Sequence, residues 1–127
     1  MSQKLTTIGV VLLLLICICA VEQVSVHAIT GKALKETAEI TDLIFEQRLD
    51  AAKEKTHALD MAWEKSAAFL ETMVDHSSTD DVRYALSRLT AALESGDYAA
   101  AMIYAGELEG CIEHVLERQK VTLENLF

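Results

Sequence analysis

The chain has no proline, and aromatic residues make up only 6% of its 127 residues. Proline breaks helices because it lacks a backbone donor, so no interruption of that kind is present. Five glycines are the only other strong breakers. Because 51% of the residues are hydrophobic while aromatics and breakers are scarce, the composition indicates long, alanine-rich helices and not an aromatic-rich β fold.

Basic residues are also few. Eleven Lys and Arg stand against 20 Asp and Glu, which gives a net charge of −9. Lys4 is the only charged residue before Glu22, so the part of the chain after Val21 carries −10. Nucleic-acid binding needs clustered Lys and Arg, and adsorption to anionic lipid needs a basic helix face. The charge therefore argues against both kinds of partner.

Three cysteines give no disulfide framework. Cys17 and Cys19 lie within an apolar run, and Cys111 is alone in the rest of the chain. We expect Cys111 to pack as a small hydrophobic residue, with an intermolecular bridge as the alternative.

The apolar run extends from Leu5 to Val21 and contains no charge: LTTIGVVLLLLICICAV, 17 residues, the short end of the range for a spanning helix. Lipid offers no hydrogen-bond partners, so such a segment must be helical. We predict an uncleaved signal-anchor, with residues 1–28 as tail and transmembrane anchor and 29–127 as an acidic helical domain. Cleavage after Val26-His27-Ala28 is the alternative.

The predicted location is the cell membrane, crossed once by residues 5–21. The short N-terminal tail carries Lys4, while Lys32 and Lys35 follow the run on the other side, so counting basic residues does not decide the orientation. We favour the N-terminus inside and the domain outside the cell.

A stripe of mostly apolar residues repeats at alternating steps of four and three residues. Its members are Phe45, Leu49, Ala52, Thr56, Leu59, Trp63, Ser66, Leu70 and Met73. This spacing is typical of coiled-coil packing, so we predict one long amphipathic helix over 30–73. A second helix over 80–94 and a third from Tyr98 are predicted on either side of Ser95-Gly96-Asp97, where Gly96 can adopt the left-handed conformation.

The expected fold is therefore all-α: a transmembrane helix, then a long amphipathic helix packed on a C-terminal helical hairpin as a three-helix bundle. A helix over 30–73 would reach roughly 65 Å, whereas the hairpin helices would reach only about 22 and 30 Å. The membrane-proximal part of the long helix then needs other cover. The alternative is that this helix breaks and folds back.

This mismatch predicts an interaction surface for self-association or for a protein partner. Its residues are the uncovered apolar side chains of the long helix and the apolar end of the chain: Leu34, Ile40, Leu43, Ile44, Phe45, Leu126 and Phe127. We expect the apolar end of the chain to dock on its own bundle, with presentation to a partner as the alternative.

The distal half resembles an uncharacterised bacterial family of short, N-terminally membrane-anchored helical proteins, a domain of unknown function found in Gram-positive genomes. The residues that carry the resemblance lie between Ala58 and the end of the chain: Trp63-Glu64, Val74-Asp75-His76, Leu86, Leu89, Gly96-Asp97 and Thr122 to Phe127. The resemblance implies membrane attachment and a helical fold. It implies no activity and no site.

Two sets of side chains have the spacing of metal ligands on a helix. One is His57, Asp60 and Glu64; the other is Cys111 with His114, for which His76 would be a distant third ligand. Both are incomplete without another helix, and polar faces carry such residues commonly. We predict no metal and no cofactor.

Asp75-His76 could suggest acid–base chemistry, but no orienting partner or substrate position accompanies the pair. We predict no catalytic residue and no enzyme. Trp63 falls on the apolar stripe, so we expect it to anchor the core. The predicted function is a membrane-tethered protein-interaction or assembly module at the cell envelope; the alternative is an extracytoplasmic helical domain that binds a small ligand or metal.

Overall fold

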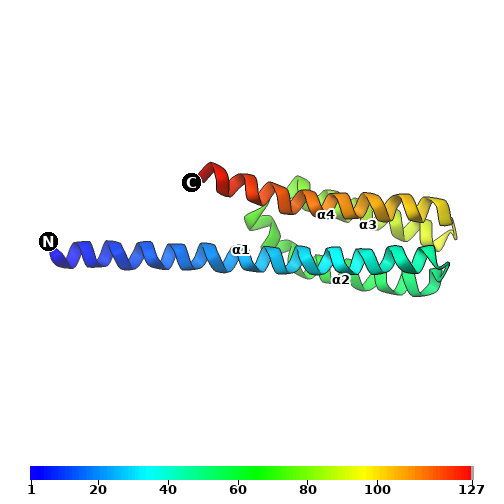
Figure 1. Ribbon diagram of the computed structural model, residues 1–127, viewed down its shortest axis with the longest axis horizontal. Coiled ribbons are helices and arrows are strands. Elements are labelled where there is room, and N and C mark those ends of the chain that lie inside the picture. Colours follow the sequence, from blue (N-terminus) through cyan, green and yellow to red (C-terminus); the bar gives the residue numbers. More distant parts are fainter. Residues whose placement is uncertain (127) are drawn as a thin grey trace.

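Four helices make up the fold of the computed structural model, which describes the backbone of residues 1–126 and the side chains of residues 1–118. They are α1 (Ser2–Phe45), α2 (Leu49–Met73), α3 (His76–Glu94) and α4 (Tyr98–Leu126). Figure 1 shows α1 as a rod whose second half lies beside the other three helices, while its first half extends alone. The all-α prediction is confirmed.

The predicted long helix over 30–73 is wrong, because the chain reverses at Glu46–Arg48 and α2 returns alongside α1. The three-helix bundle is therefore replaced by four helices, of which the second half of α1 is the first. Helices consecutive in the chain are neighbours, and α4 also packs on α1, which closes the ring. The break removes the length mismatch that called for cover from another chain.

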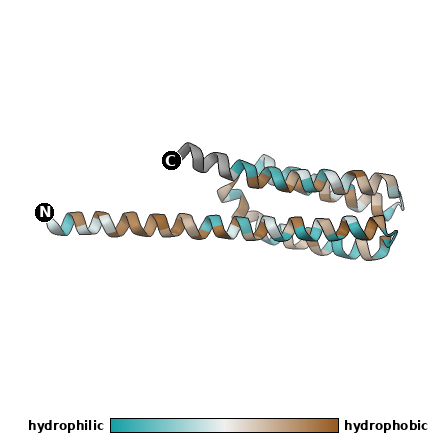
Figure 2. Ribbon diagram, viewed as in Figure 1, coloured by the Kyte–Doolittle hydropathy of each residue, from teal (hydrophilic) through white to brown (hydrophobic). Residues whose placement is uncertain are grey.

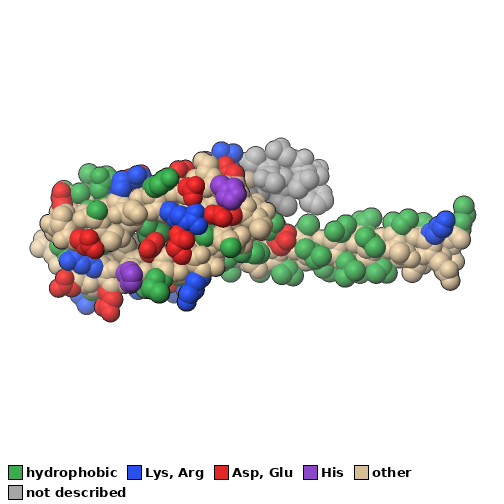
Figure 3. Space-filling model, turned by 180° about the vertical axis from the view of Figure 1, so that it is seen from behind, with side chains coloured by type: hydrophobic (Ala, Val, Ile, Leu, Met, Phe, Trp, Pro, Cys, Tyr) green, Lys and Arg blue, Asp and Glu red, His purple; other side chains and the backbone are tan. Residues whose placement is uncertain are grey.

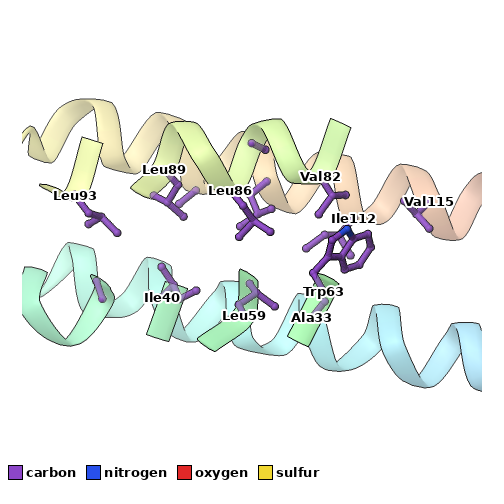
Figure 4. Packing of buried hydrophobic residues seen from close by; sticks show 14 of the residues in the cluster. Ala33, Ile40, Leu59, Trp63, Val82, Leu86, Leu89, Leu93, Ile112 and Val115 are labelled. Atoms are coloured by element: carbon purple, nitrogen blue, oxygen red, sulfur yellow. The ribbon is translucent and has the colours of Figure 1, made fainter. Parts of the chain in front are cut away.

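The core residues of α1 and α2 follow one another at steps of three or four residues. In α1 the buried positions are Val26, Thr30, Ala33, Thr37, Ile40 and Ile44, and in α2 they are Ala52, Thr56, Leu59, Trp63, Ala67 and Leu70. Most of the predicted apolar stripe is therefore core. Figure 4 shows Ile40, Leu59 and Trp63 directed at the side chains of the opposite pair of helices, among them Leu86, Leu89 and Ile112. Such spacing is the geometry of left-handed bundles.

The second half of α1 and α2 form a first helical hairpin, and α3 and α4 form a second. The two hairpins repeat one another at a shift of 49 residues, so that Ile44 corresponds to Leu93 and Gln47 to Gly96. Nine buried positions of the first hairpin fall on buried positions of the second. The pairs are Thr30/Thr79, Ala33/Val82, Thr37/Leu86, Ile40/Leu89, Ile44/Leu93, Ala52/Ala101, Thr56/Ala105, Leu59/Leu108 and Trp63/Ile112. The bundle is thus an approximate structural repeat of one helical hairpin.

The first half of α1 is long and apolar enough to cross a membrane, judged by length and composition, and none of its most apolar window is buried. Figure 2 shows a continuous hydrophobic stretch in this half, after a more hydrophilic N-terminal end. Burial begins at Val26, only five residues after Val21. Because α1 runs through residues 22–28 without a break, the apolar segment and the bundle share one rigid helix.

Candidate functional site

The predicted interaction surface separates into buried and exposed parts. Ile40 and Ile44 are fully buried in the bundle, and Leu34 and Leu43 are half-buried against its core. Phe45 is exposed to 71% at the end of α1. Leu126 is the last residue of α4, its side chain lies outside the described residues, and so does Phe127. Among the described members of this surface, only Phe45 is largely exposed, because the fold itself covers the two isoleucines.

The possible metal ligands do not converge. His57 and Glu64 are exposed on α2, with Asp60 half-buried between them. Within the described part of the chain, no group of three His, Cys, Asp or Glu side chains is placed to hold a metal ion. His76 lies 3.6 Å from Glu71, its neighbour across the α2–α3 turn.

Cys111 is half-buried on α4, as expected of a small packed residue. Burial raises the pKa of its thiol, and the nearby carboxylates of Asp81 and Glu107 raise it further. A thiol is nucleophilic only as the thiolate, so this environment makes Cys111 less reactive than an ordinary cysteine.

Salt bridges join consecutive helices. Lys55 pairs with Glu39 between α2 and α1, and Arg88 pairs with Glu107 between α3 and α4. Figure 3 shows charged side chains of both signs across the bundle, and hydrophobic ones along the extended half of α1. The bundle surface is therefore rich in charge, in contrast to the apolar half of α1.

Arg83 carries the densest of these networks. Its guanidinium group donates to Glu64 at 2.6 Å and to Glu71 at 3.0 Å, both on α2, and to Asp80 at 2.7 Å on its own helix. Hydrogen bonds to Glu64 first, and then to Asp80 and Glu71, raise the pKa of Arg83 above its ordinary value. This network holds α3 against α2 near the turn that contains Asp75. Its role is therefore structural.

A groove between α1 and α2 lies at the end of the bundle next to the apolar half of α1. Its cavity volume is about 290 Å³, at the small end for ligand sites. It is lined by Ala28, Ile29, Lys32, Ala33 and Glu36 of α1, and by Leu59, Ala62, Trp63 and Ser66 of α2. The candidate metal ligands His57, Glu64 and His114 do not line it.

Small side chains create this groove. At the corresponding place between α3 and α4, Val82 and Cys111 stand where the groove has Ala33 and Ala62. Trp63 lines it from α2, and its indole extends away into the core, beside Val82 and Ile112 (Figure 4). Trp63 is thus a core anchor, as predicted, and one wall of the groove.

The indole nitrogen of Trp63 is buried and has no hydrogen-bond partner among the described residues. An unpaired buried donor costs about 1–3 kcal/mol, so a purely apolar ring would fill this place with less penalty. Sequence reasoning missed the groove because its two walls become neighbours only through the break at Gln47. The alanines that flank the stripe were the available signal.

One family model, described as Domain of unknown function (DUF4363), matches residues 21–126, which is nearly the whole bundle. No curated protein and no solved structure matches the chain significantly. The family match agrees with the resemblance of the distal half to an uncharacterised helical family. On the strength of a match that covers well over half of its length, the chain belongs to the DUF4363 family.

Proposed function

We propose that the protein is a single-pass membrane protein whose four-helix bundle acts as an interaction or assembly module at the cell envelope, outside the cell. The observation that carries the proposal is the continuity of α1, from a fully exposed apolar half into a wall of the bundle. An exposed apolar helix of this length is stable in a bilayer, whereas in water it would leave a long hydrophobic surface uncovered.

The continuous helix between the apolar segment and the bundle supports an interaction role, because it sets how far the bundle extends from the membrane. Phe45 lies 24 residues beyond Val21, so the free end of the hairpins stands roughly 36 Å above the apolar segment. Phe45 and Tyr98 are both exposed at this end, one closing α1 and the other opening α4. Aromatic side chains of this kind are common anchors of protein interfaces.

Membrane insertion is tested by flotation of the full chain with liposomes, followed by carbonate extraction. We expect the full chain to float and to resist extraction, and a chain that begins at Glu22 to stay in the soluble fraction. Orientation is tested with a single cysteine at exposed Ser87, after replacement of the native cysteines. A membrane-impermeant maleimide should label it in intact cells; protection until lysis would place the bundle inside.

The interaction role is tested by a photoreactive residue at Phe45, with Tyr84, an exposed tyrosine in the middle of α3, as the matched position. A discrete crosslinked product from Phe45 and not from Tyr84 is expected. Equal crosslinking from both positions, or from neither, would argue against a partner at this end of the bundle.

A further inference from the structure

We propose that the groove between α1 and α2 holds an acyl chain of a phospholipid from the same membrane that anchors α1, with Lys32 beside the lipid phosphate. The inference rests on the proposed membrane insertion. It concerns a different part of the bundle from the aromatic end that is proposed to meet a protein.

The position of the groove selects this occupant. Ala28, its nearest residue on α1, is seven residues beyond Val21, or roughly 10 Å along the helix. The headgroup layer reaches about 5–8 Å beyond the hydrocarbon on each side of a bilayer. The near end of the groove therefore opens at the outer edge of the headgroups, where a lipid tail needs only a short path to enter.

The lining has the chemistry of an amphiphile site. Alanine, leucine, isoleucine and tryptophan side chains make up most of its wall, so an acyl chain would bury apolar surface there. Lys32 stands at the rim with 73% of its side chain exposed, and the ion pair that it makes with Glu36 is long at 4.0 Å. An anionic phosphate can therefore approach its ammonium group without breaking a close pair.

The repeat shows that the fold does not require this space. The second hairpin has Val82 for Ala33, Cys111 for Ala62 and Asp81 for Lys32, so both the small side chains and the cation are particular to the first hairpin. Filling the groove with larger side chains would have increased packing in the ordinary way. Its place next to the apolar segment, with a cation at its rim, fits an occupant from the membrane.

Trp63 offers a direct test because it is the only tryptophan and lines the groove. It lies level with Ala33 (Figure 4), which is twelve residues, or roughly 18 Å, beyond Val21. Brominated acyl chains quench tryptophan only at short range, so bromine in the groove can act on this ring through the groove wall, whereas bromine that stays within the bilayer is too far away. The full-length protein is reconstituted in vesicles of phosphatidylglycerol with brominated or ordinary acyl chains, and flotation is measured on the same samples.

Loss of Trp63 fluorescence in the brominated vesicles is expected for the native chain. Ala62→Leu places a larger side chain in the groove and should abolish this loss. Ala58→Leu, one turn away on α2, exposed and outside the groove, is the matched control and should keep it. Lys32→Gln should reduce quenching by brominated phosphatidylglycerol, whereas Lys35→Gln, exposed on the same helix, should not.

The outcomes separate the two proposals. If the protein does not float, membrane insertion itself is wrong. If it floats but its fluorescence is the same in both vesicles, the groove does not take an acyl chain, although the anchor stands. Quenching that Ala62→Leu leaves unchanged would also overturn the inference, because the bromine would then reach the ring by another route, such as a bundle lying on the membrane.

Discussion

The turns that close the two hairpins have the same backbone hydrogen bonds but different residues. In the first, Arg48 donates to Leu43 and Gln47 to Ile44; in the second, Asp97 donates to Ala92 and Gly96 to Leu93. Both are Schellman motifs, in which one residue adopts positive φ. That residue is Gln47 at φ 60° in the first turn and Gly96 at φ 72° in the second.

The second turn has the residues that this motif favours, and the first does not. Glycine adopts positive φ freely, whereas glutamine there is strained. Asp97 also caps α4, since its carboxylate accepts from the backbone N–H of Ala100 at 3.0 Å, while Arg48 makes no such bond at the start of α2. The comparison teaches that packing of the apolar faces, and not local preference, forms the first turn.

The core of the first hairpin is also less favourable than that of the second, because it contains buried hydroxyl groups where the second has apolar side chains. Thr37 and Thr56 are buried in the first, and each hydroxyl donates to the carbonyl four residues earlier in its own helix. The second hairpin has Leu86 and Ala105 at these positions. The first hairpin thus has a less favourable turn residue, no side-chain cap on its second helix, and a more polar core at these two positions.

Truncation of matched core residues should have the largest effect. Ile40→Ala and Leu89→Ala, at corresponding positions, should each lower the free energy of unfolding by about 2–5 kcal/mol, because each leaves a cavity in a fully buried layer. Urea denaturation of a fragment that starts at Glu22 measures this. A loss well below this range at Ile40 alone would show that the first hairpin is loosely packed there.

Exchange of the turn residues should have the next largest effect. Gly96→Ala should destabilise the fragment by about 1–2 kcal/mol, since alanine is strained at positive φ. Gln47→Gly should stabilise it by about 0.5–1 kcal/mol, because relief of strain is partly offset by the entropy of glycine in the unfolded chain. If both substitutions destabilise, Gln47 has contacts that outweigh its backbone strain.

The caps should differ by a smaller amount. Asp97→Ala removes the hydrogen bond to Ala100 and should cost about 1 kcal/mol, while Arg48→Asp should gain up to about 1 kcal/mol by supplying the missing cap. Thermal melts of both variants at moderate salt measure these changes as a lower melting temperature for Asp97→Ala and a higher one for Arg48→Asp. Arg48→Asn, which leaves no negative charge, separates capping from the effect of charge.

Low pH should destabilise the fold through Asp75 of the second hairpin, whose counterpart in the first is the uncharged Val26. Hydrogen bonding from Ser78 lowers the pKa of Asp75, and nearby Arg118 lowers it further. A carboxylate with a lowered pKa stabilises the fold above its ordinary pKa of about 4, and this contribution is lost as the pH falls through the lowered value. Melting at several pH values should show a smaller acid loss for Asp75→Asn than for the native chain.

The candidate surfaces could be predicted only in part. Spacing alone placed Trp63 in the core, and Gly96 with Asp97 gave the second turn, as the structure confirms. The place of Phe45 at the free end of a hairpin, and the burial of Ile40 and Ile44, could not be read in this way. They depend on the reversal at Gln47, which no glycine or proline marks.

The sequence by itself determined the helical class, the apolar segment at the N-terminus and the faces that turn inward, because these follow from composition and from the spacing of apolar residues along each helix. The tertiary structure alone decided the number of helices in the bundle and the place of the groove. A strained turn at Gln47 persists because closing the ring buries the stripes of α1 and α2 against α3 and α4. That burial exceeds the local cost, and no local pattern records it.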